Sequence, residues 1–276
     1  MKNNIEQTYL NLMKKTLAFL LWPEPPAPIE LLWRSKRAKL ERFIIPIISK
    51  IFKKFNLQIG KIQNFSSDQR AVGKIWPGYA DTMIGIKRLD NIQHCIENVL
   101  NEKVEGDLIE TGAWRGGACI FMRAVLKVYG IEDRKIFVAD SFKGLPKPDA
   151  EKYPADKGDD HHTHAVLSVS REDVEMNFKK YDLLDKQVVF LEGWFKDTLP
   201  QAPIEKLSIL RLDGDMYSST MECLEILYPK LSKGGYCIID DYALSGCNAA
   251  VNDYRSKHKI ESEIKKIDWT GIYWKK

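Results

Sequence analysis

Short apolar runs alternate with helical stretches along the chain from about residue 106 onward. The β-like runs are residues 107–110, 135–140, 188–192, 207–213 and 236–240. Segments with helical periodicity separate them, at residues 117–129, 171–181 and 219–231. Strands that alternate with helices in this way predict an α/β fold with a parallel sheet and right-handed crossovers.

The C-terminal segment predicts a different strand arrangement. Residues 262–268 and 271–274 have the pattern of two strands joined by the turn Asp268-Trp-Thr-Gly271, and a tight turn makes neighbouring strands antiparallel. Five parallel strands with a terminal antiparallel hairpin form the Rossmann-like sheet of class I methyltransferases, whereas dinucleotide-dependent dehydrogenases have an all-parallel sheet. We therefore predict the class I methyltransferase sheet.

The N-terminal part of the chain has a separate character. Residues 5–22 have helical periodicity and end at a proline-rich connector, residues 23–28. The stretch from residue 34 to residue 55 is basic and apolar and contains Pro46. It is typical of a helix that faces the core or a second subunit, and a helix lying on a membrane surface is the alternative. We predict an N-terminal helical and basic extension over residues 1–68 and an α/β domain over residues 69–276.

Composition indicates an ordinary globular protein, with 44% hydrophobic and 29% charged residues. The net charge of +4 is too small to indicate a nucleic-acid partner. Five cysteines without a CxxC pair favour reduced thiols. No apolar run has the length of a membrane span, and residues 16–22 are followed by prolines where a signal peptide has small residues. We expect a cytoplasmic protein that forms a homo-oligomer.

Four aspartates follow two of the predicted strands. Asp213 and Asp215 end one strand, and Asp240 and Asp241 end the next. The carboxyl ends of parallel strands face the ligand crevice of an open α/β sheet, where four like charges repel unless a cation binds them. The alternative is that they are turn residues and helix N-caps. Carboxylates without intervening Cys or His favour Mg²⁺, with Mn²⁺ or Ca²⁺ as the alternative hard ions, over zinc.

A glycine-containing loop, residues 110–118, follows the first predicted strand, and we call it the cofactor loop. Its sequence, ETGAWRGGA, allows a sharp turn, but it is not the GxGxxG pattern of a pyrophosphate site. Asp140 ends the second predicted strand, where a carboxylate suits the two hydroxyls of a ribose. This combination indicates S-adenosylmethionine, and a nucleotide-dependent oxidoreductase on a similar sheet is the alternative.

Five ordered motifs resemble the macrocin O-methyltransferase family, whose members methylate sugar hydroxyls of macrolide and aminocoumarin antibiotics. They are residues 81–91, 107–117, 138–146, 191–200 and 210–218, within a resemblance that runs from about Gln69 to Trp274. Residues 23–65 depart from the family in being longer and more basic. The resemblance implies S-adenosylmethionine-dependent O-methylation of a glycoside or other saccharide. A non-sugar hydroxylated small molecule is the alternative acceptor.

The resemblance also implies residue roles. Asp213, Asp240 and Asp241 coordinate the metal ion, and Asp215 is the general base that takes the proton of the acceptor hydroxyl. The implied cofactor set is Thr82 and Met83 at its border, Glu110, Thr111, Gly112, Ala113, Trp114 and Arg115 around the methionine part, Asp140 and Ser141 at the ribose, and Ser170, Gly193 and Trp194 near the adenine. Ser170 is equally suited to be the N-cap of the helix that follows it.

The long polar segment over residues 143–170 contains three prolines and is too long for a passive connection. We expect it to form a lid over the acceptor. Its cluster of His161, His162 and His164 could supply a base in place of Asp215 or a metal ligand, or it could be a set of exposed polar side chains. The sequence does not identify the acceptor.

Overall fold

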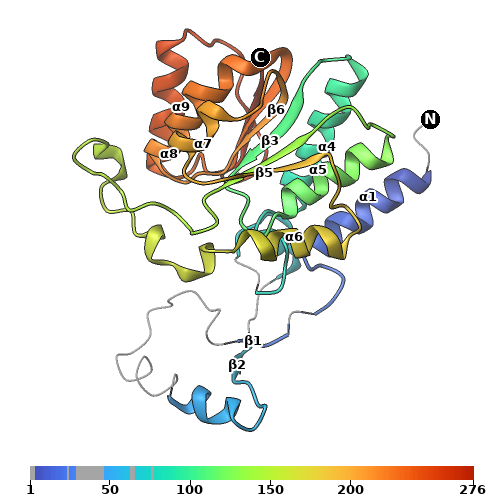
Figure 1. Ribbon diagram of the computed structural model, residues 1–276, viewed down its shortest axis with the longest axis vertical. Coiled ribbons are helices and arrows are strands. Elements are labelled where there is room, and N and C mark those ends of the chain that lie inside the picture. Colours follow the sequence, from blue (N-terminus) through green and yellow to red (C-terminus); the bar gives the residue numbers. More distant parts are fainter. Residues whose placement is uncertain (1–3, 24, 29–46, 63–65, 76–77) are drawn as a thin grey trace.

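The computed structural model describes residues 4–23, 25–28, 47–62, 66–75 and 78–276, and its main body is a seven-stranded sheet between helices (Figure 1). The strands are β3 (Asp107–Thr111), β4 (Ile136–Asp140), β5 (Val188–Glu192), β6 (Leu207–Leu212), β7 (Leu231–Ile239), β8 (Lys265–Lys266) and β9 (Ile272–Lys275). Their spatial order is β5-β4-β3-β6-β7-β9-β8. The first five are mutually parallel, and β9 pairs antiparallel with both β7 and β8. The predicted sheet is confirmed, although β8 is shorter than expected.

Helices cover both faces of the sheet, and two apolar clusters fill the space beneath them. One cluster joins the sheet to α1 (Asn4–Leu17), α4 (Ile86–Asn101), α5 (Gly117–Val128) and α6 (Arg171–Lys180). The other joins it to α8 (Tyr217–Leu227) and α9 (Ser245–Lys257). Leu108 belongs to the first cluster and Ile109 to the second, because successive side chains of a strand point to opposite faces. The apolar residues of β3 and β6 are buried on both faces of the sheet, and the polar residues Glu110, Ser208 and Arg211 are buried among them.

The helix boundaries differ from the sequence prediction at identifiable residues. Helix α4 begins at Ile86, after the bends of residues 81–85, which lie beside the cavity described below. The helix predicted to reach Leu231 ends at Leu227, where Pro229 lies in a 3-10 turn, η6 (Tyr228–Lys230). Helix α9 was not predicted, since few of its residues are apolar.

Helix α1 packs on the main body, with Leu10, Met13 and Leu17 buried in the first apolar cluster. Lys14 on its buried side donates to Asp90 at 2.6 Å. Of the segment 5–22 that was predicted to be helical, residues 5–17 form a helix, and this helix contributes to the core. The proposed division of the chain at residue 68 stays a prediction.

Beyond α1 the described chain leaves the main body (Figure 1). The short strands β1 (Ala27–Pro28) and β2 (Gly60–Lys61) pair with each other. We call residues 47–62 the arm, in which residues 47–53 are helical. Its apolar side chains are exposed, so the expectation of a core-facing helix is wrong for these residues. Residues 34–46 of the predicted basic stretch lie outside the described residues.

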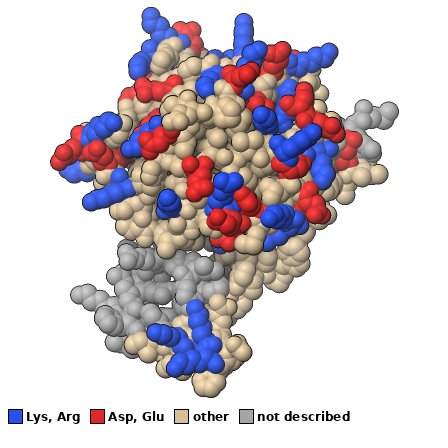
Figure 2. Space-filling model, viewed as in Figure 1, with Lys and Arg blue, Asp and Glu red and all other residues tan. Residues whose placement is uncertain are grey.

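The distribution of charged residues on the surface and the state of the cysteines agree with what the composition indicated. Lys, Arg, Asp and Glu are interspersed on the face of the main body in Figure 2. All five cysteines are buried free thiols. No helix in the described ranges is both long and apolar enough to cross a membrane.

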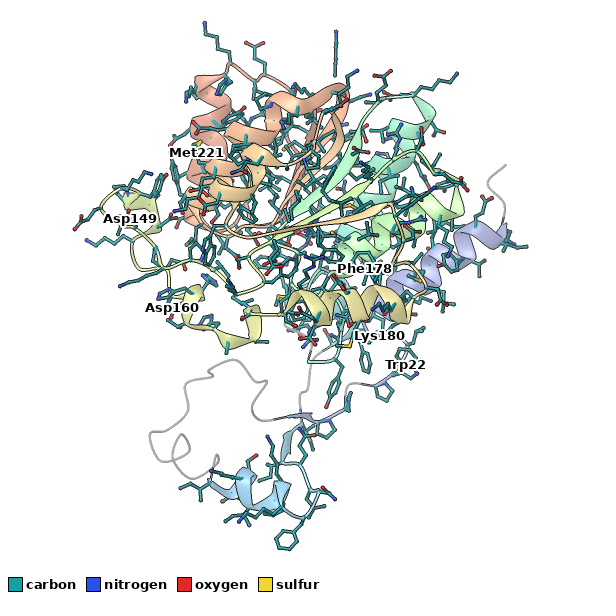
Figure 3. All side chains as sticks on the ribbon, viewed as in Figure 1. Trp22, Asp149, Asp160, Phe178, Lys180 and Met221 are labelled. Carbon is teal, nitrogen blue, oxygen red and sulfur yellow. The ribbon has the colours of Figure 1, made fainter. Side chains whose placement is uncertain are left out.

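The lid, residues 143–170, contains three short 3-10 turns, η2 (Pro154–Asp156), η3 (His161–Thr163) and η4 (Ala165–Leu167). Figure 3 shows its Asp149 and Asp160 at the outer edge of the molecule. Hydrogen bonds at Asp156 and Val166 are among the contacts that attach the lid to the body. The Asp156 carboxylate accepts hydrogen bonds from the backbone N–H of Tyr217 (2.6 Å) and Ser218 (3.0 Å), at the N-terminus of α8. The Trp114 indole N–H donates to the carbonyl of Val166 at 2.8 Å.

Candidate active site

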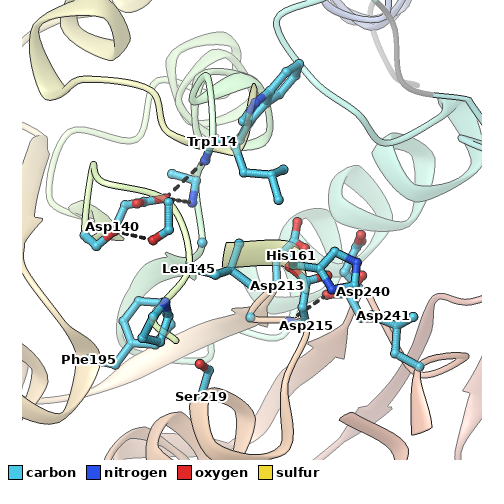
Figure 4. A pocket seen from close by; sticks show the side chains of 18 of the residues that line it. Trp114, Asp140, Leu145, His161, Phe195, Asp213, Asp215, Ser219, Asp240 and Asp241 are labelled. Carbon is cyan, nitrogen blue, oxygen red and sulfur yellow. Dashed lines mark hydrogen bonds between the residues drawn. The ribbon is translucent and has the colours of Figure 1, made fainter. Parts of the chain in front are cut away.

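A cavity of about 450 Å³ lies at the carboxyl ends of β3, β4, β6 and β7 (Figure 4). The loops that follow these strands form its floor, and the lid forms one wall through Leu145, Tyr153 and His161. Open α/β sheets bind ligands at this edge, and the volume is in the range of small-molecule sites. The cavity therefore lies where the sequence predicted the ligand crevice.

The cofactor loop is shaped by close backbone contacts. Gly112 has φ +88°, and a Cβ atom there would lie 1.7 Å from the carbonyl oxygen of Asp213. Glycine is consequently required at this position. Trp114 also has a positive φ, 48°, which costs energy for a residue with a side chain. The hydrogen bonds between the loop backbone and Asp140 offset this strain.

Asp140, the last residue of β4, holds the cofactor loop in place through hydrogen bonds. Its Oδ2 accepts hydrogen bonds from the backbone N–H of Ala113 (2.8 Å) and Trp114 (3.2 Å), and its Oδ1 accepts one from Phe142 (2.8 Å). Burial raises the pKa of the carboxyl, and the three backbone donors oppose that shift. A carboxylate has about four lone-pair sites, so Oδ1 retains one for a ligand in the cavity.

Most of the predicted cofactor residues border the cavity. They are Thr82, Met83, Glu110, Gly112, Ala113, Trp114, Asp140, Ser141, Gly193 and Trp194. Thr111, Arg115 and Ser170 do not line it. Thr111 is fully buried, and the Arg115 guanidinium donates to the carbonyls of Gly78 (3.0 Å) and Ala80 (2.7 Å). Ser170 is the N-cap of α6 and accepts from the Asp173 N–H at 3.1 Å. Contacts of these three with a cofactor stay predictions.

The four aspartates converge on one side of the cavity, and we call them the acid cluster (Asp213, Asp215, Asp240 and Asp241). Carboxylate oxygens of Asp213, Asp240 and Asp241 lie within 4.8 Å of one another. The Asp215 N–H donates to Oδ2 of Asp241 at 3.3 Å, drawn as a dashed line in Figure 4. Asp215 has φ 58°, a left-handed conformation that turns the chain back over the cluster. The sequence correctly indicated that these residues meet.

Charge repulsion and burial act together in the acid cluster. Burial, followed by the carboxylates of Asp215 and Asp213, raises the pKa of Asp241 well above its usual range. Burial and Asp213 raise the pKa of Asp215 to about 7. A divalent cation would offset this repulsion, and an all-carboxylate donor set suits a hard ion such as Mg²⁺. The residues present therefore fit the ion that the sequence predicted.

Two buried arginines, which the sequence reasoning missed, hold part of this cluster. Arg211 donates to Glu110 and Asp240 and, at 2.8 Å, to Asp213. Arg88 donates to Asp240 and, at 2.8 Å, to Asp268. Arg211 is fully buried and links the cofactor loop to the acid cluster. The sequence contained one signal for this arrangement, which is a charged residue within the largely apolar strand LSILRL.

One histidine of the lid cluster faces the cavity. His161 lines it next to the acid cluster (Figure 4), and its Nδ1 lies 2.7 Å from Oδ2 of Asp159. Asp159 raises the pKa of His161 through this hydrogen bond. His162 is exposed. The reading as an exposed polar side chain therefore holds for His162, and a role of His161 as base or metal ligand stays a prediction.

Known proteins resemble the chain along most of its length. The family model described as Macrocin-O-methyltransferase (TylF) matches residues 6–276. An 8-demethyl-8-(2,3-dimethoxy-alpha-L-rhamnosyl)-tetracenomycin-C 4'-O-methyltransferase of Streptomyces olivaceus is 53% identical over 210 residues, which are 76% of this chain and 80% of that protein. The mycinamicin III 3''-O-methyltransferase of Micromonospora griseorubida is 51% identical over 215 residues, which are 77% of this chain and 85% of that protein.

A solved structure agrees with these matches. The O-methyltransferase NovP superposes on this chain with a TM-score of 0.83 at 44% identity. The superposition covers 98% of this chain and 99% of NovP, so the similarity of fold extends over almost the whole chain.

Proposed function

The chain belongs to the macrocin O-methyltransferase family, and from this premise we propose that it methylates a sugar hydroxyl of a glycosylated small molecule, with S-adenosylmethionine as the methyl donor and a divalent metal ion at the acid cluster. The observation that carries the proposal is one cavity bordered by both the cofactor loop and the acid cluster. A donor and an activated acceptor must meet within bond-forming distance.

S-adenosylmethionine supplies a methyl group on a sulfonium, whose thioether leaves without an acid. The acceptor oxygen forms the new bond to the methyl carbon as the carbon–sulfur bond breaks. We assign Glu110 and the backbone of residues 112–114 to the methionine part, and Asp140 to the ribose. These groups surround one end of the cavity and leave the acid cluster for the acceptor.

The difficult part of the reaction is the acceptor, because a sugar hydroxyl ionises only at strongly basic pH. A hard divalent ion stabilises the alkoxide form and orients a vicinal diol. Asp213, Asp240 and Asp241 would hold it, because their oxygens lie within 4.8 Å of one another. Arg88 and Arg211 keep Asp240 oriented, so the ion would use remaining lone pairs of that carboxylate.

Asp215 is the proposed general base, since it borders the cavity beside the predicted metal ligands. His161 is the competing candidate, because it borders the same part of the cavity and is oriented by Asp159. We assign His161 to holding the acceptor on the lid side and Asp215 to receiving the proton.

The sugar acceptor is supported by the relatives. The Streptomyces and Micromonospora proteins are named for methylation of a rhamnosyl-tetracenomycin and of mycinamicin III. We propose a glycoside or other saccharide for this chain. Five buried free thiols support a cytoplasmic location. A homo-oligomer is part of the proposal, for which the exposed Ile5 and Leu12 on α1 offer an apolar contact.

Radiolabelled S-adenosylmethionine should transfer its methyl group to members of a panel of glycosides when Mg²⁺ is present. Non-sugar phenols and diols should be poor acceptors in the same assay. Calorimetry should detect binding of S-adenosylmethionine and none of NAD. Binding of NAD with no methyl transfer would favour the oxidoreductase alternative.

Replacement of Asp140 by alanine should weaken S-adenosylmethionine binding about ten- to a hundred-fold. A hydrogen bond to a charged group contributes about 1.5–3 kcal/mol, and Asp140 also orders the backbone at Ala113 and Trp114. Calorimetry and the melting temperature should be measured on the same variant.

An analogue of S-adenosylhomocysteine without ribose hydroxyls separates the two roles of Asp140. The wild-type protein should bind the deoxy analogue more weakly than the parent compound, and the Asp140→Ala variant should bind both equally. An equal preference in both proteins would mean that Asp140 only orders the loop.

A further inference from the structure

The arm, residues 47–62, has a series of exposed apolar side chains. Its exposed members are Ile47, Ile48, Ile51, Phe52, Phe55, Leu57 and Ile62. Ile51 is 51% exposed and Phe55 is 71% exposed. Scattered apolar residues are normal on a protein surface, but a contiguous apolar segment indicates a binding surface.

The helical part of the arm is amphipathic. Residues 47–53 are helical, and successive residues of an α-helix are about 100° apart around its axis. Ile47, Ile48, Ile51 and Phe52 therefore occupy an arc of about 140°. Lys50 and Lys53 project from the opposite side. Apolar and cationic side chains are thus separated on one short element.

The charge of the arm is entirely positive. It contains Lys50, Lys53, Lys54 and Lys61 and no Asp or Glu. Figure 2 shows Lys and Arg side chains, and no Asp or Glu side chains, among the described residues at the lower tip of the face that it draws. In the sequence, residues 29–66 contain nine Lys and Arg against two Glu, whereas the rest of the chain has 33 basic and 36 acidic residues. The positive charge is concentrated in this one region.

We propose that the arm binds the surface of an anionic lipid bilayer. Apolar side chains of such a helix enter the boundary between headgroups and acyl chains, and the lysines contact lipid phosphates. A bilayer suits both kinds of side chain at once, because its anionic headgroups supply the negative charge that the arm itself lacks. A second copy of the chain is the alternative that the experiment below distinguishes. The binding is independent of methyl transfer, since the arm does not line the cavity.

The full-length protein should sediment with vesicles of phosphatidylcholine and phosphatidylglycerol, and only weakly with phosphatidylcholine alone. Binding should weaken as salt rises, because the phosphate contacts are screened. The triple variant K50Q/K53Q/K54Q should lose about a hundred-fold in affinity for the anionic vesicles, at about fivefold for each lysine. The variants I51D and F55D should each lose at least about tenfold.

Met176→Asp is the matched control, because Met176 on α6 is also 51% exposed but lies outside the arm. Its vesicle binding should equal that of the wild type. Methyl transfer to a water-soluble acceptor should be unchanged in every variant, which shows that each has folded.

Three results would overturn the proposal. The first is a wild-type protein that does not bind anionic vesicles, and the second is equal binding by the wild type and I51D. The third is sedimentation velocity in which I51D dissociates an oligomer of the wild type while neither protein binds vesicles. That last result would assign the arm to a second copy. Vesicle binding by a wild-type protein that transfers no methyl group to any glycoside would contradict the proposed function and leave this inference standing.

Discussion

Replacement of Asp241 by asparagine is expected to lower the rate of methyl transfer by about 10³-fold or more, while S-adenosylmethionine affinity changes little. Each unit by which the metal ion lowers the pKa of the acceptor hydroxyl is about 1.4 kcal/mol, or tenfold in rate. Loss of three such units gives the expected effect. The cofactor is spared because its assigned contacts lie on the cofactor loop and Asp140.

Asp241 is a better position for this test than Asp240. Both oxygens of Asp240 are bonded to Arg88 and Arg211, so its replacement would leave two buried arginines partly unpaired. The hydrogen bond to Asp241 comes from the Asp215 backbone N–H, and asparagine retains an oxygen to accept it.

Removal of the metal ion is the second part of the experiment. EDTA-treated wild-type enzyme should lose activity and regain it with Mg²⁺, and Asp241→Asn should not be rescued. Asp133→Asn is a suitable control, because Asp133 is exposed and does not border the cavity. Full activity of the wild type after EDTA treatment would refute the metal mechanism.

Asp215→Asn should lower the rate of methyl transfer about 10²- to 10⁴-fold, which is the usual effect of losing a general base. Asparagine tolerates the left-handed backbone conformation that Asp215 adopts. The fold and the N–H donated to Asp241 should therefore be preserved. Calorimetric titration with Mg²⁺ should show metal binding close to that of the wild type.

Histidine variants distinguish the two candidate bases. His161→Gln should raise the KM for the acceptor more than it lowers kcat, if His161 holds the acceptor as proposed. His162→Gln is the matched control, because His162 is exposed in the same turn. A small effect of Asp215→Asn together with a large loss of kcat in His161→Gln would make His161 the base. Absent metal binding in Asp215→Asn would instead make Asp215 a ligand.

The sheet was predictable because its signals are local. Each parallel strand is an apolar run, and the hairpin before the C-terminus is marked by the turn at residues 268–271. The meeting of Asp213 and Asp240 was predictable too, because strand ends converge at one edge of a parallel sheet. Helix α9 was missed because its sequence, SGCNAAVNDYRSK, has few apolar residues and its burial depends on α8 and the sheet.

The arginines could not be assigned partners from sequence. Arg211 and Glu110 are 101 residues apart, and Arg88 and Asp268 are 180 residues apart. Such pairs are formed only by the order of strands in the sheet and by the position of α4. Position in the chain likewise did not distinguish His161 from His162, because that difference arises from the way the lid folds.

The attachment of the lid has a consequence for how this enzyme could diversify. Asp156 and Val166 connect the lid to α8 and Trp114, and His161 lies between these two anchors. Substitutions or insertions between the anchors would reshape the part of the cavity wall at His161 while the sheet and the glycine-containing loop stay unchanged. Duplicated genes could thus acquire new acceptors one loop at a time, without rebuilding the methyl-donor site.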